Sequence, residues 1–245
     1  MLYSGLVSVT FRKLGPGEII KLVKKAGLDG IEWGGDIHVP HGDVGKAAEV
    51  YKITEDSGLK VASYGSYYRP GGSSNNAPFE AVLETAAALH APTIRVWAGE
   101  RASKDADKAY WGKVIAETRQ IADLAATAGI TVSFEYHPNT LTDTPDSARR
   151  LMEETAHRNV KSYWQSGADE DRGLWMAGLR SIIPWLSNVH VSCAAIELAD
   201  ARDIWADYFD VLKNAAGSRF CMIEFVKGGT ADQFLKDAAV LKSLL

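Results

Sequence analysis

The sequence alternates eight times between β-rich and helical segments, and this alternation constrains the fold more than any other feature. Runs rich in β-branched and aromatic residues recur at intervals of roughly 30 residues, which is the size of a βα unit. The stretches between them carry apolar residues at helical spacing, as in Ile19, Ile20 and Val23. We therefore predict strands at residues 5–9, 30–33, 60–64, 93–97, 131–136, 160–164, 188–191 and 220–225.

Helix boundaries can also be predicted from the sequence. Pro16 and Pro145 lie where a first helical turn is expected, and Thr144 is a suitable N-cap before Pro145. Gly27 follows a helical run and precedes a predicted strand, as do the glycines at 58 and 129. A glycine in that place is typical of a left-handed helix end.

Eight βα units in 245 residues predict an α/β protein with one domain over residues 1–245, a single (β/α)8 TIM barrel. The alternative is an open, doubly wound sheet. Its nucleotide-binding versions carry G-x-G-x-x-G in the first βα turn. Residues 8–17 lack this motif, and no P-loop occurs in the sequence. The closed barrel is therefore preferred.

Composition narrows the partners and the location. The net charge of −4 argues against nucleic acid, because phosphate binding needs an excess of Lys and Arg on one face. No run approaches the ~18 apolar residues of a spanning helix, and the first ten residues do not resemble a signal peptide. Cys193 and Cys221 are too few for a disulfide framework and lie in apolar runs. We expect a cytoplasmic protein with buried thiols and no membrane partner.

In a TIM barrel the chemistry takes place at the carboxyl ends of the strands. Only a short set of polar residues lies at the predicted strand ends: Glu32, His38, Arg95, Glu135, His137, Gln165, His190 and Glu224. These positions define the candidate site.

Four of these residues end consecutive strands, five to eight. Glu135, Gln165, His190 and Glu224 offer two carboxylates, an amide oxygen and an imidazole, a set that suits a divalent cation. The two glutamates are also the predicted catalytic residues, one as base and one as acid. Taken singly, Glu135 could be salt-bridged to an arginine and His190 could be a core histidine. Four such residues at equivalent strand ends favour a metal site.

Several motifs resemble one known family. Phe-Glu-Tyr-His-Pro at 134–138 is similar to the Glu-x-His segment of the xylose-isomerase-like superfamily of sugar isomerases and epimerases. Further similarity lies at 30–33, 94–99, 188–191 and 222–226, so it covers nearly the whole chain. The resemblance implies a metal site with Glu135, His190 and Glu224 as ligands, and glutamates that exchange the substrate proton. Mn²⁺ or Mg²⁺ is the expected ion, with Co²⁺ or Zn²⁺ as alternatives.

The sequence departs from the family pattern twice. Members usually carry Asp at the end of strand six, where this chain has Gln165, a ligand without charge. The Asp that often follows the strand-seven histidine is replaced by Ser192. Asp169 and Asp171 could compensate from the next loop, although a solvated acidic loop is the simpler interpretation.

A second group of residues is predicted to contact the substrate. Imidazoles can exchange hydrogen bonds with hydroxyls, aromatic rings can pack on sugar faces, and a loop cation can bind a phosphate or carboxylate. The ordinary alternatives are a surface loop for the histidines, core packing for the tryptophans and a solvated lysine. The predicted set is His38, His137, Trp33, Trp97, Trp164 and Lys227. His41 and Arg69 are weaker candidates, and residues 69–78 could form a lid.

These features predict a metal-dependent isomerase or epimerase of a small sugar or sugar phosphate, working by proton transfer through an enediolate. Two alternatives remain: a lyase or dehydratase using the same site, and a barrel that binds sugar without catalysis. An apurinic-site endonuclease shares the fold but needs more metal ligands and a basic groove, so six histidines and a net charge of −4 disfavour it. The expected partner is a small carbohydrate. A homo-oligomer is compatible with the resemblance.

Overall fold

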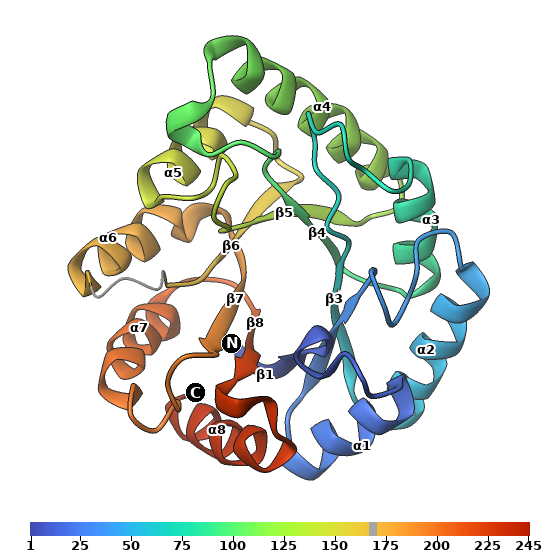
Figure 1. Cartoon of the computed structure of the whole chain (residues 1–245), viewed down its shortest axis with the longest axis vertical. Helices are drawn as coiled ribbons and strands as arrows, with labels where there is room; N and C mark the ends of the chain where they lie inside the picture. The colour runs from blue at the N-terminus through green and yellow to red at the C-terminus, as the bar shows by residue number, and fades with distance from the viewer. Residues whose placement is uncertain (167–170) are drawn as a thin grey trace.

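Eight parallel strands close into a barrel, and their order around it follows the sequence (Figure 1). The computed structural model describes residues 1–166 and 171–245. The strands are β1 (Leu2–Val7), β2 (Gly30–Gly34), β3 (Lys60–Gly65), β4 (Thr93–Trp97), β5 (Thr131–Glu135), β6 (Val160–Trp164), β7 (Leu186–Cys193) and β8 (Arg219–Val226). The predicted closed barrel is confirmed.

Helices surround the barrel, one after each strand, as Figure 1 shows. They are α1 (Pro16–Ala26), α2 (Val44–Asp56), α3 (Phe79–Ala88), α4 (Lys108–Thr127), α5 (Pro145–Thr155), α6 (Arg172–Ile182), α7 (Arg202–Asn214) and α8 (Ala231–Leu244). Short 3-10 turns occur at Ser8–Phe11, Ser103–Asp105, Ile183–Trp185 and Lys227–Gly229. Within the described parts of the chain, no helix is both long and apolar enough to cross a membrane.

The barrel closes through pairing of the first strand with the last. In this pairing Gly5 lies opposite Met222, and Leu6 lies opposite Ile223. The prediction placed the first strand three residues too late, because residues from Ser8 onward turn into the 3-10 segment. The strands β7 and β8 are longer than predicted, and they pair from Val189 opposite Cys221 to Cys193 opposite Val226.

The predicted helix signals are confirmed at both ends. Thr144 caps α5 by accepting a hydrogen bond from the Ser147 amide, and Pro145 occupies the first helical position. Gly27 ends α1 with φ of 68°, in the left-handed region that favours glycine. These capping residues fix where each helix begins or ends, and so where the chain can turn toward the next strand.

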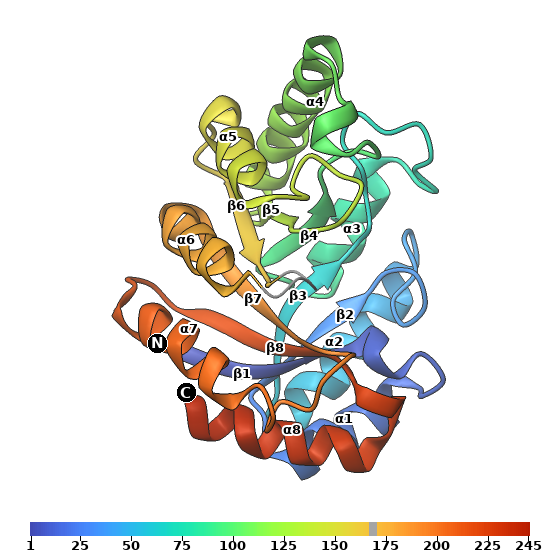
Figure 2. The ribbon, with the colours of Figure 1, turned by 60° about the vertical axis from the view of Figure 1, so that its left-hand side comes forward.

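Strand alternation divides the side chains into two layers. Along β4, Ile94 and Val96 are fully buried in the large apolar cluster between strands and helices. Arg95 and Trp97 take the opposite face, toward the barrel interior. Each buried aliphatic side chain of the outer layer contributes about 1.5–3 kcal/mol. That layer therefore supplies most apolar stabilisation, and the interior can accommodate polar groups near the strand ends. Figure 2 shows α1 and α8 lying along the outer side of β1 and β8.

Candidate active site

Polar and charged side chains fill the barrel interior toward the carboxyl ends of the strands. Glu32 on β2, Arg95 on β4, Glu135 on β5 and His190 on β7 are each at most 2% exposed. Ionised groups at such depth require partners of opposite charge, since an isolated buried charge is strongly unfavourable. Their mutual contacts therefore define the site.

Arg95 is the central cation of this interior. Its Nε lies 2.7 Å from Glu32 Oε1, and its Nη1 pairs with Glu135 Oε2. Ser63 donates to the other oxygen of Glu32 at 2.6 Å. The indole Nε1 of Trp97 donates to the same Glu135 oxygen that Arg95 binds. Glu135 is thus held on one side by two donors, and its Oε1 faces the barrel axis.

Glu135, His190 and Glu224 form the candidate metal centre. Nδ1 of His190 lies 3.1 Å from Glu135 Oε1 and 3.5 Å from Glu224 Oε1. One potential ligand atom from each of the three residues lies within 4.8 Å of the others. Strands β5, β7 and β8 bring them together from positions far apart in sequence.

The electrostatics of the two glutamates differ. Burial opposes the charge on Glu135, but Arg95 and His190 outweigh it and lower its pKa. For Glu224, burial dominates and the neighbouring Glu135 adds to it, raising the pKa to about 7. Burial also opposes the imidazolium of His190, but Glu224 and Glu32 outweigh this and raise its pKa to about 10. In the absence of a cation, the cluster therefore retains protons near neutral pH.

Two buried atoms at this end of the barrel fit a cation. Gln165 Oε1 is buried without a hydrogen-bond partner among the described residues, and His190 Nδ1 faces the carboxylates of Glu135 and Glu224. Gln165 Nε2 donates to the Tyr136 carbonyl at 2.5 Å, which fixes the amide and leaves its oxygen free. An imidazole nitrogen, two carboxylates and an amide oxygen are suitable ligands for Mn²⁺ or Mg²⁺. The residues present therefore fit a divalent cation.

Asp171, in the loop after β6, has a role in capping α6. Asp171 caps α6 by accepting a hydrogen bond from the Leu174 amide at 2.9 Å. Its carboxylate thus has a structural partner. Asp169 lies outside the described residues.

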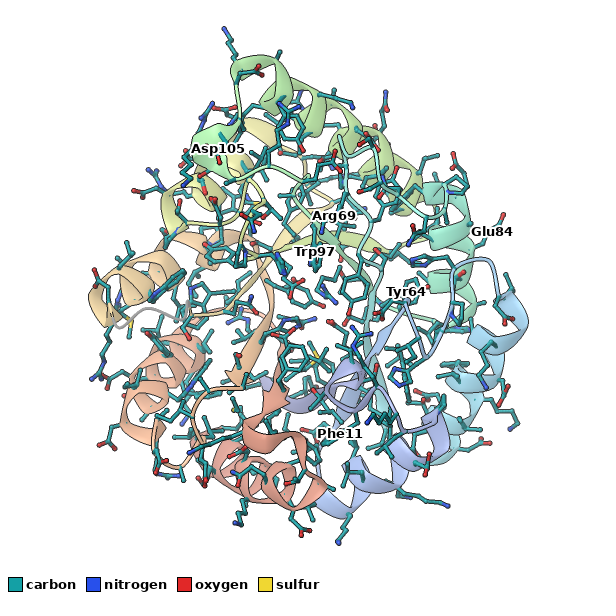
Figure 3. The ribbon with its side chains drawn as sticks, viewed as in Figure 1. Phe11, Tyr64, Arg69, Glu84, Trp97 and Asp105 are labelled. Atoms are coloured by element: carbon teal, nitrogen blue, oxygen red, sulfur yellow. The ribbon has the colours of Figure 1, made fainter. Side chains whose placement is uncertain are left out.

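Trp97 organises a wall at the mouth of the barrel. The His137 ring stacks on it with ring centroids 4.0 Å apart, the Arg69 guanidinium lies 4.1 Å from its centroid, and Tyr67 contacts it edge-on. His137 Nδ1 is 2.7 Å from the Pro138 carbonyl, which can only accept, so Nδ1 carries hydrogen and Nε2 is free. Figure 3 shows Arg69 and Trp97 together over the inner part of the ring of strands.

Other predicted contact residues lie away from the mouth. Trp33 and Trp164 are fully buried between the strands and the helices, and Trp164 packs on Trp205 and Tyr208 of α7. Both indoles are therefore core residues in this structure. Successive side chains of a strand point to opposite faces. Each tryptophan is next in sequence to an inward-facing residue, so its own side chain points outward to the helices.

The remaining candidates have structural partners. His38 is buried, with Nδ1 2.9 Å from Ser8 Oγ and Nε2 3.2 Å from the Leu14 carbonyl. His41 is similarly engaged, with Tyr64 and the Ser66 carbonyl. Lys227 is half-exposed at the mouth, 4.0 Å from Glu197.

The segment 69–78 is anchored to its surroundings. The Asn75 side chain bonds both the amide and the carbonyl of Arg69, at 2.8 and 3.0 Å. Glu117 on α4 accepts from the Gly71 amide, and Glu100 accepts from the hydroxyl of Ser73. The contacts describe a fixed rim of the mouth.

Sequence reasoning missed Tyr67 and the role of Arg95. Tyr67 follows β3 with φ of 58°, a left-handed conformation that is strained for a tyrosine. Its ring lies 4.7 Å from the Arg95 guanidinium. No sequence signal marks that backbone conformation. Arg95 was identifiable as a strand-end residue, but its two partners come from other strands.

Comparison with known proteins gives one family. The family model described as xylose isomerase-like TIM barrel matches residues 20–191 of the chain. This range includes Glu135 and His190 and ends before Glu224.

Individual relatives are enzymes of several kinds. A 3-dehydroshikimate dehydratase from Bacillus anthracis is 27% identical over 255 residues, covering 93% of this chain and 83% of that protein. The crystal structure of a probable 3-dehydroshikimate dehydratase from the same organism has a TM-score of 0.78 at 20% identity, covering 99% of both chains.

Two further solved structures share the fold. A D-psicose 3-epimerase has a TM-score of 0.74 at 20% identity, covering 98% of this chain and 97% of the other. The IolI protein, solved with a zinc atom, has a TM-score of 0.74 at 15% identity, covering 99% and 97%.

Proposed function

The chain belongs to the xylose isomerase-like TIM barrel family, and on that premise we propose that it is a divalent-metal enzyme of small polyhydroxylated substrates. The reaction is removal of a proton from the carbon beside a carbonyl group. One observation carries the proposal: Glu135, His190 and Glu224 converge with ligand atoms within 4.8 Å at the catalytic end of the barrel.

Four side chains of this centre would hold the ion. They are Glu135, His190 and Glu224, with the free oxygen of Gln165 as a neutral fourth ligand. When bound, Mn²⁺ or Mg²⁺ supplies Lewis-acid polarisation of the substrate carbonyl. The zinc atom in the IolI structure supports a metal in this fold, and Zn²⁺ and Co²⁺ remain alternative ions.

The two glutamates have different tasks in this proposal. Arg95 and Trp97 occupy one oxygen of Glu135, so this residue is a poor base and acts chiefly as an oriented ligand. Glu224 contacts a single polar partner among the described residues, His190. Its side chain is 12% exposed, whereas those of Glu135 and His190 are at most 3% exposed. As the more accessible of the two carboxylates, Glu224 is suited to accept and return a proton.

This asymmetry favours an isomerase that uses one base. Glu224 removes the proton from one carbon, giving an enediolate, and returns it to the neighbouring carbon or the same one. Inversion at one carbon, as in an epimerase, needs a second proton carrier on the opposite face. The free Nε2 of His137 is the candidate for that task.

A dehydratase is the second candidate. It is supported by the Bacillus anthracis dehydratase, which aligns with 93% of this chain. In this alternative Glu224 takes the proton, the C–H electron pair forms the new C=C bond, and the β-hydroxyl leaves as water after protonation. The first step, removal of the proton by Glu224, is the same as in the isomerase.

The proposal is tested first by metal binding. Protein stripped with EDTA is titrated with Mn²⁺ and melted. We expect a rise in Tm, because a ligand at 100 times its Kd stabilises by about 2.7 kcal/mol. Glu224→Gln should reduce the rise, whereas Glu153→Gln on the surface of α5 should not. The absence of any shift would favour a barrel that has lost its metal and its catalysis.

The reaction class is tested by NMR in D₂O. Candidate sugars and 3-dehydroshikimate are incubated with the Mn²⁺-loaded protein. Deuterium incorporation without loss of water indicates an isomerase or epimerase, and loss of water indicates the dehydratase. Glu224→Gln should abolish both. Full exchange by that variant would contradict the assignment of the base.

The free thiols of Cys193 and Cys221 agree with a reducing compartment, which supports the proposed cytoplasmic location.

A further inference from the structure

We propose that Arg69 binds a carboxylate group of the substrate, so that the enzyme acts on a polyhydroxylated acid and not on a neutral sugar. This inference rests on the proposed function, because it assigns a substrate class to the same site.

Arg69 is placed at the mouth by stacking and hydrogen bonding. Its guanidinium lies 4.1 Å from the centroid of Trp97, and its Nη1 donates to the Gly99 carbonyl at 2.9 Å. Trp97 in turn binds Glu135 through its indole nitrogen. One aromatic ring therefore separates the Arg69 charge from a ligand of the candidate metal centre, as the labelled pair in Figure 3 illustrates.

Among the described residues Arg69 forms no ion pair with a carboxylate, and its Nη1 donates to the Gly99 carbonyl. Glu100 is the acidic residue whose charge most raises the pKa of Arg69. That carboxylate instead accepts hydrogen bonds from Ser73 and from the Ser74 hydroxyl. By contrast, Arg95 in the interior has two carboxylate partners. A half-buried cation without a counter-ion at a substrate entrance is suited to bind an anion.

The main chain of Arg69 is held in place before any ligand arrives. Asn75 bonds its amide and its carbonyl, and the neighbouring Gly71 amide donates to Glu117 at 2.7 Å. A preorganised guanidinium loses little conformational entropy when it binds, which increases affinity. The anchored rim thus presents the charge in a defined position.

The charges inside the barrel would not repel a substrate anion once a divalent ion is bound. Arg95 neutralises Glu32, and a divalent ion neutralises Glu135 and Glu224. Gln165 is neutral, so it adds no negative charge beside these carboxylates. The neutral Gln165 and the unpaired Arg69 therefore both favour an anionic substrate.

A carboxylate fits this position better than a phosphate. A planar guanidinium matches a carboxylate with two parallel hydrogen bonds. Phosphate sites usually add several backbone N–H groups at a glycine-rich turn or a helix N-terminus. A glycine-rich turn does follow Arg69, but the Gly71 amide donates to Glu117 and the Gly72 amide donates to the Arg69 carbonyl, so neither amide is available for such a cradle.

The test compares matched pairs of compounds on the Mn²⁺-loaded protein by isothermal titration at constant ionic strength. The pairs are D-glucuronate with D-glucose, and 3-dehydroshikimate with its methyl ester. D-fructose 6-phosphate with D-fructose forms a phosphate arm. We expect the acid of at least one carboxylate pair to bind about tenfold tighter, the effect of a hydrogen bond to a charged group.

Four variants locate the effect. Arg69→Gln should abolish the preference for the acid, and Arg69→Lys should restore part of it. Arg150→Gln removes a guanidinium stacked on Trp111 in the outer layer and should leave the preference intact. Gln165→Asp adds a charge to the ligand set and should reduce the preference, although Arg69 is unchanged.

The outcomes separate this inference from the proposed function. An acid preference that depends on Arg69, with no turnover of any compound, supports the inference and contradicts the function. Turnover of neutral sugars without such a preference supports the proposed function and contradicts the inference about Arg69. Three results would overturn the carboxylate assignment: no preference for the acid in either carboxylate pair, an equal preference in Arg69→Gln, or a preference confined to the phosphate arm.

Discussion

At the residue scale, Arg95 determines how the site is arranged. It binds Glu32 and Glu135, two carboxylates from strands on either side of its own. All three side chains are nearly inaccessible to solvent. A buried carboxylate without a cation is strongly unfavourable. The single arginine therefore both stabilises the barrel interior and fixes the orientation of Glu135.

Replacing Arg95 tests this role. Arg95→Met removes the arginine partner of two buried carboxylates, and we expect a loss of about 3–5 kcal/mol in the free energy of unfolding, measured with urea. Arg149→Met, which breaks an exposed pair with Glu153 on α5, should cost less than about 1 kcal/mol. Similar losses in the two variants would show that the interior network contributes little.

The pKa values of the cluster predict how the stability of metal-free protein depends on pH. The pKa of Glu224 is raised from 4.5 to about 7, and that of His190 from 6.5 to about 10. In both cases the folded state binds the proton more tightly. The stabilisation is therefore complete below the ordinary pKa and is lost as pH rises through the raised one.

We accordingly expect the free energy of unfolding of metal-free protein to fall between pH 5 and pH 10 by a few kcal/mol, since one pKa unit corresponds to about 1.4 kcal/mol. Urea titrations across this range measure it. Glu224→Gln should reduce the pH dependence of the free energy of unfolding below pH 8, whereas Glu153→Gln should leave it unchanged. A stability that rises with pH over this range would contradict the assignment.

At the element scale, a bulge in β8 places Glu224. The pairing of β7 with β8 shifts register between Ser192 and Cys193, which lie opposite Glu224 and Val226. Phe225 is the extra residue, with φ of 57° and its amide bonded to Thr10 Oγ1 at 3.0 Å. Its side chain is 39% exposed, so packing contributes little at this position.

The strain of this bulge can be measured by substitution. Phe225→Gly should keep the stability within about 1 kcal/mol of the parent, because glycine adopts positive φ readily. Phe225→Val should be less stable than the glycine variant by about 1–2 kcal/mol, because a left-handed backbone crowds a branched Cβ. Urea denaturation compares them. Equal stability of the two variants would show that the conformation is not strained.

The elements themselves were largely predictable from the sequence. Proline, threonine and glycine signals identified the ends of α1 and α5, because they act within one helical turn. The strand ends at β1, β7 and β8 were less accurate. Their lengths depend on pairing with neighbours that are distant in sequence, which local patterns do not contain.

At the scale of the whole molecule, the closed barrel keeps both thiols away from solvent. Cys193 on β7 and Cys221 on β8 are buried within the apolar cluster. Burial raises the pKa of each to about 12, with Asp237 adding to the effect at Cys193. A thiol of this kind forms little reactive thiolate at neutral pH.

The thiols should therefore report on global unfolding. Native protein is expected to react negligibly with a disulfide reagent such as DTNB at pH 7.5, whereas unfolded protein in guanidinium should expose two thiols. Fast reaction of one thiol in the native state would indicate local opening of β7 or β8. Cys193→Ser and Cys221→Ser would identify which strand opens.

The sequence by itself determined the barrel, its strand order and the polar positions at the strand ends, since periodicity and turn residues are local properties of the chain. It also singled out Glu135, His190, Glu224 and Gln165 as a group, and ligand atoms of the first three lie within 4.8 Å of one another. Only the tertiary structure decided which face each side chain occupies. Trp97 reaches the mouth, but Trp164 packs outward against α7.

The different roles of the two glutamates were likewise decided in three dimensions. In the sequence Glu135 and Glu224 are equivalent strand-end carboxylates. In the barrel, Arg95 and Trp97 bind the first, and the second has His190 as its polar partner among the described residues. The physical reason is that a pKa and a charge balance depend on burial and on neighbours contributed by other strands. Those neighbours exist only after the barrel has closed.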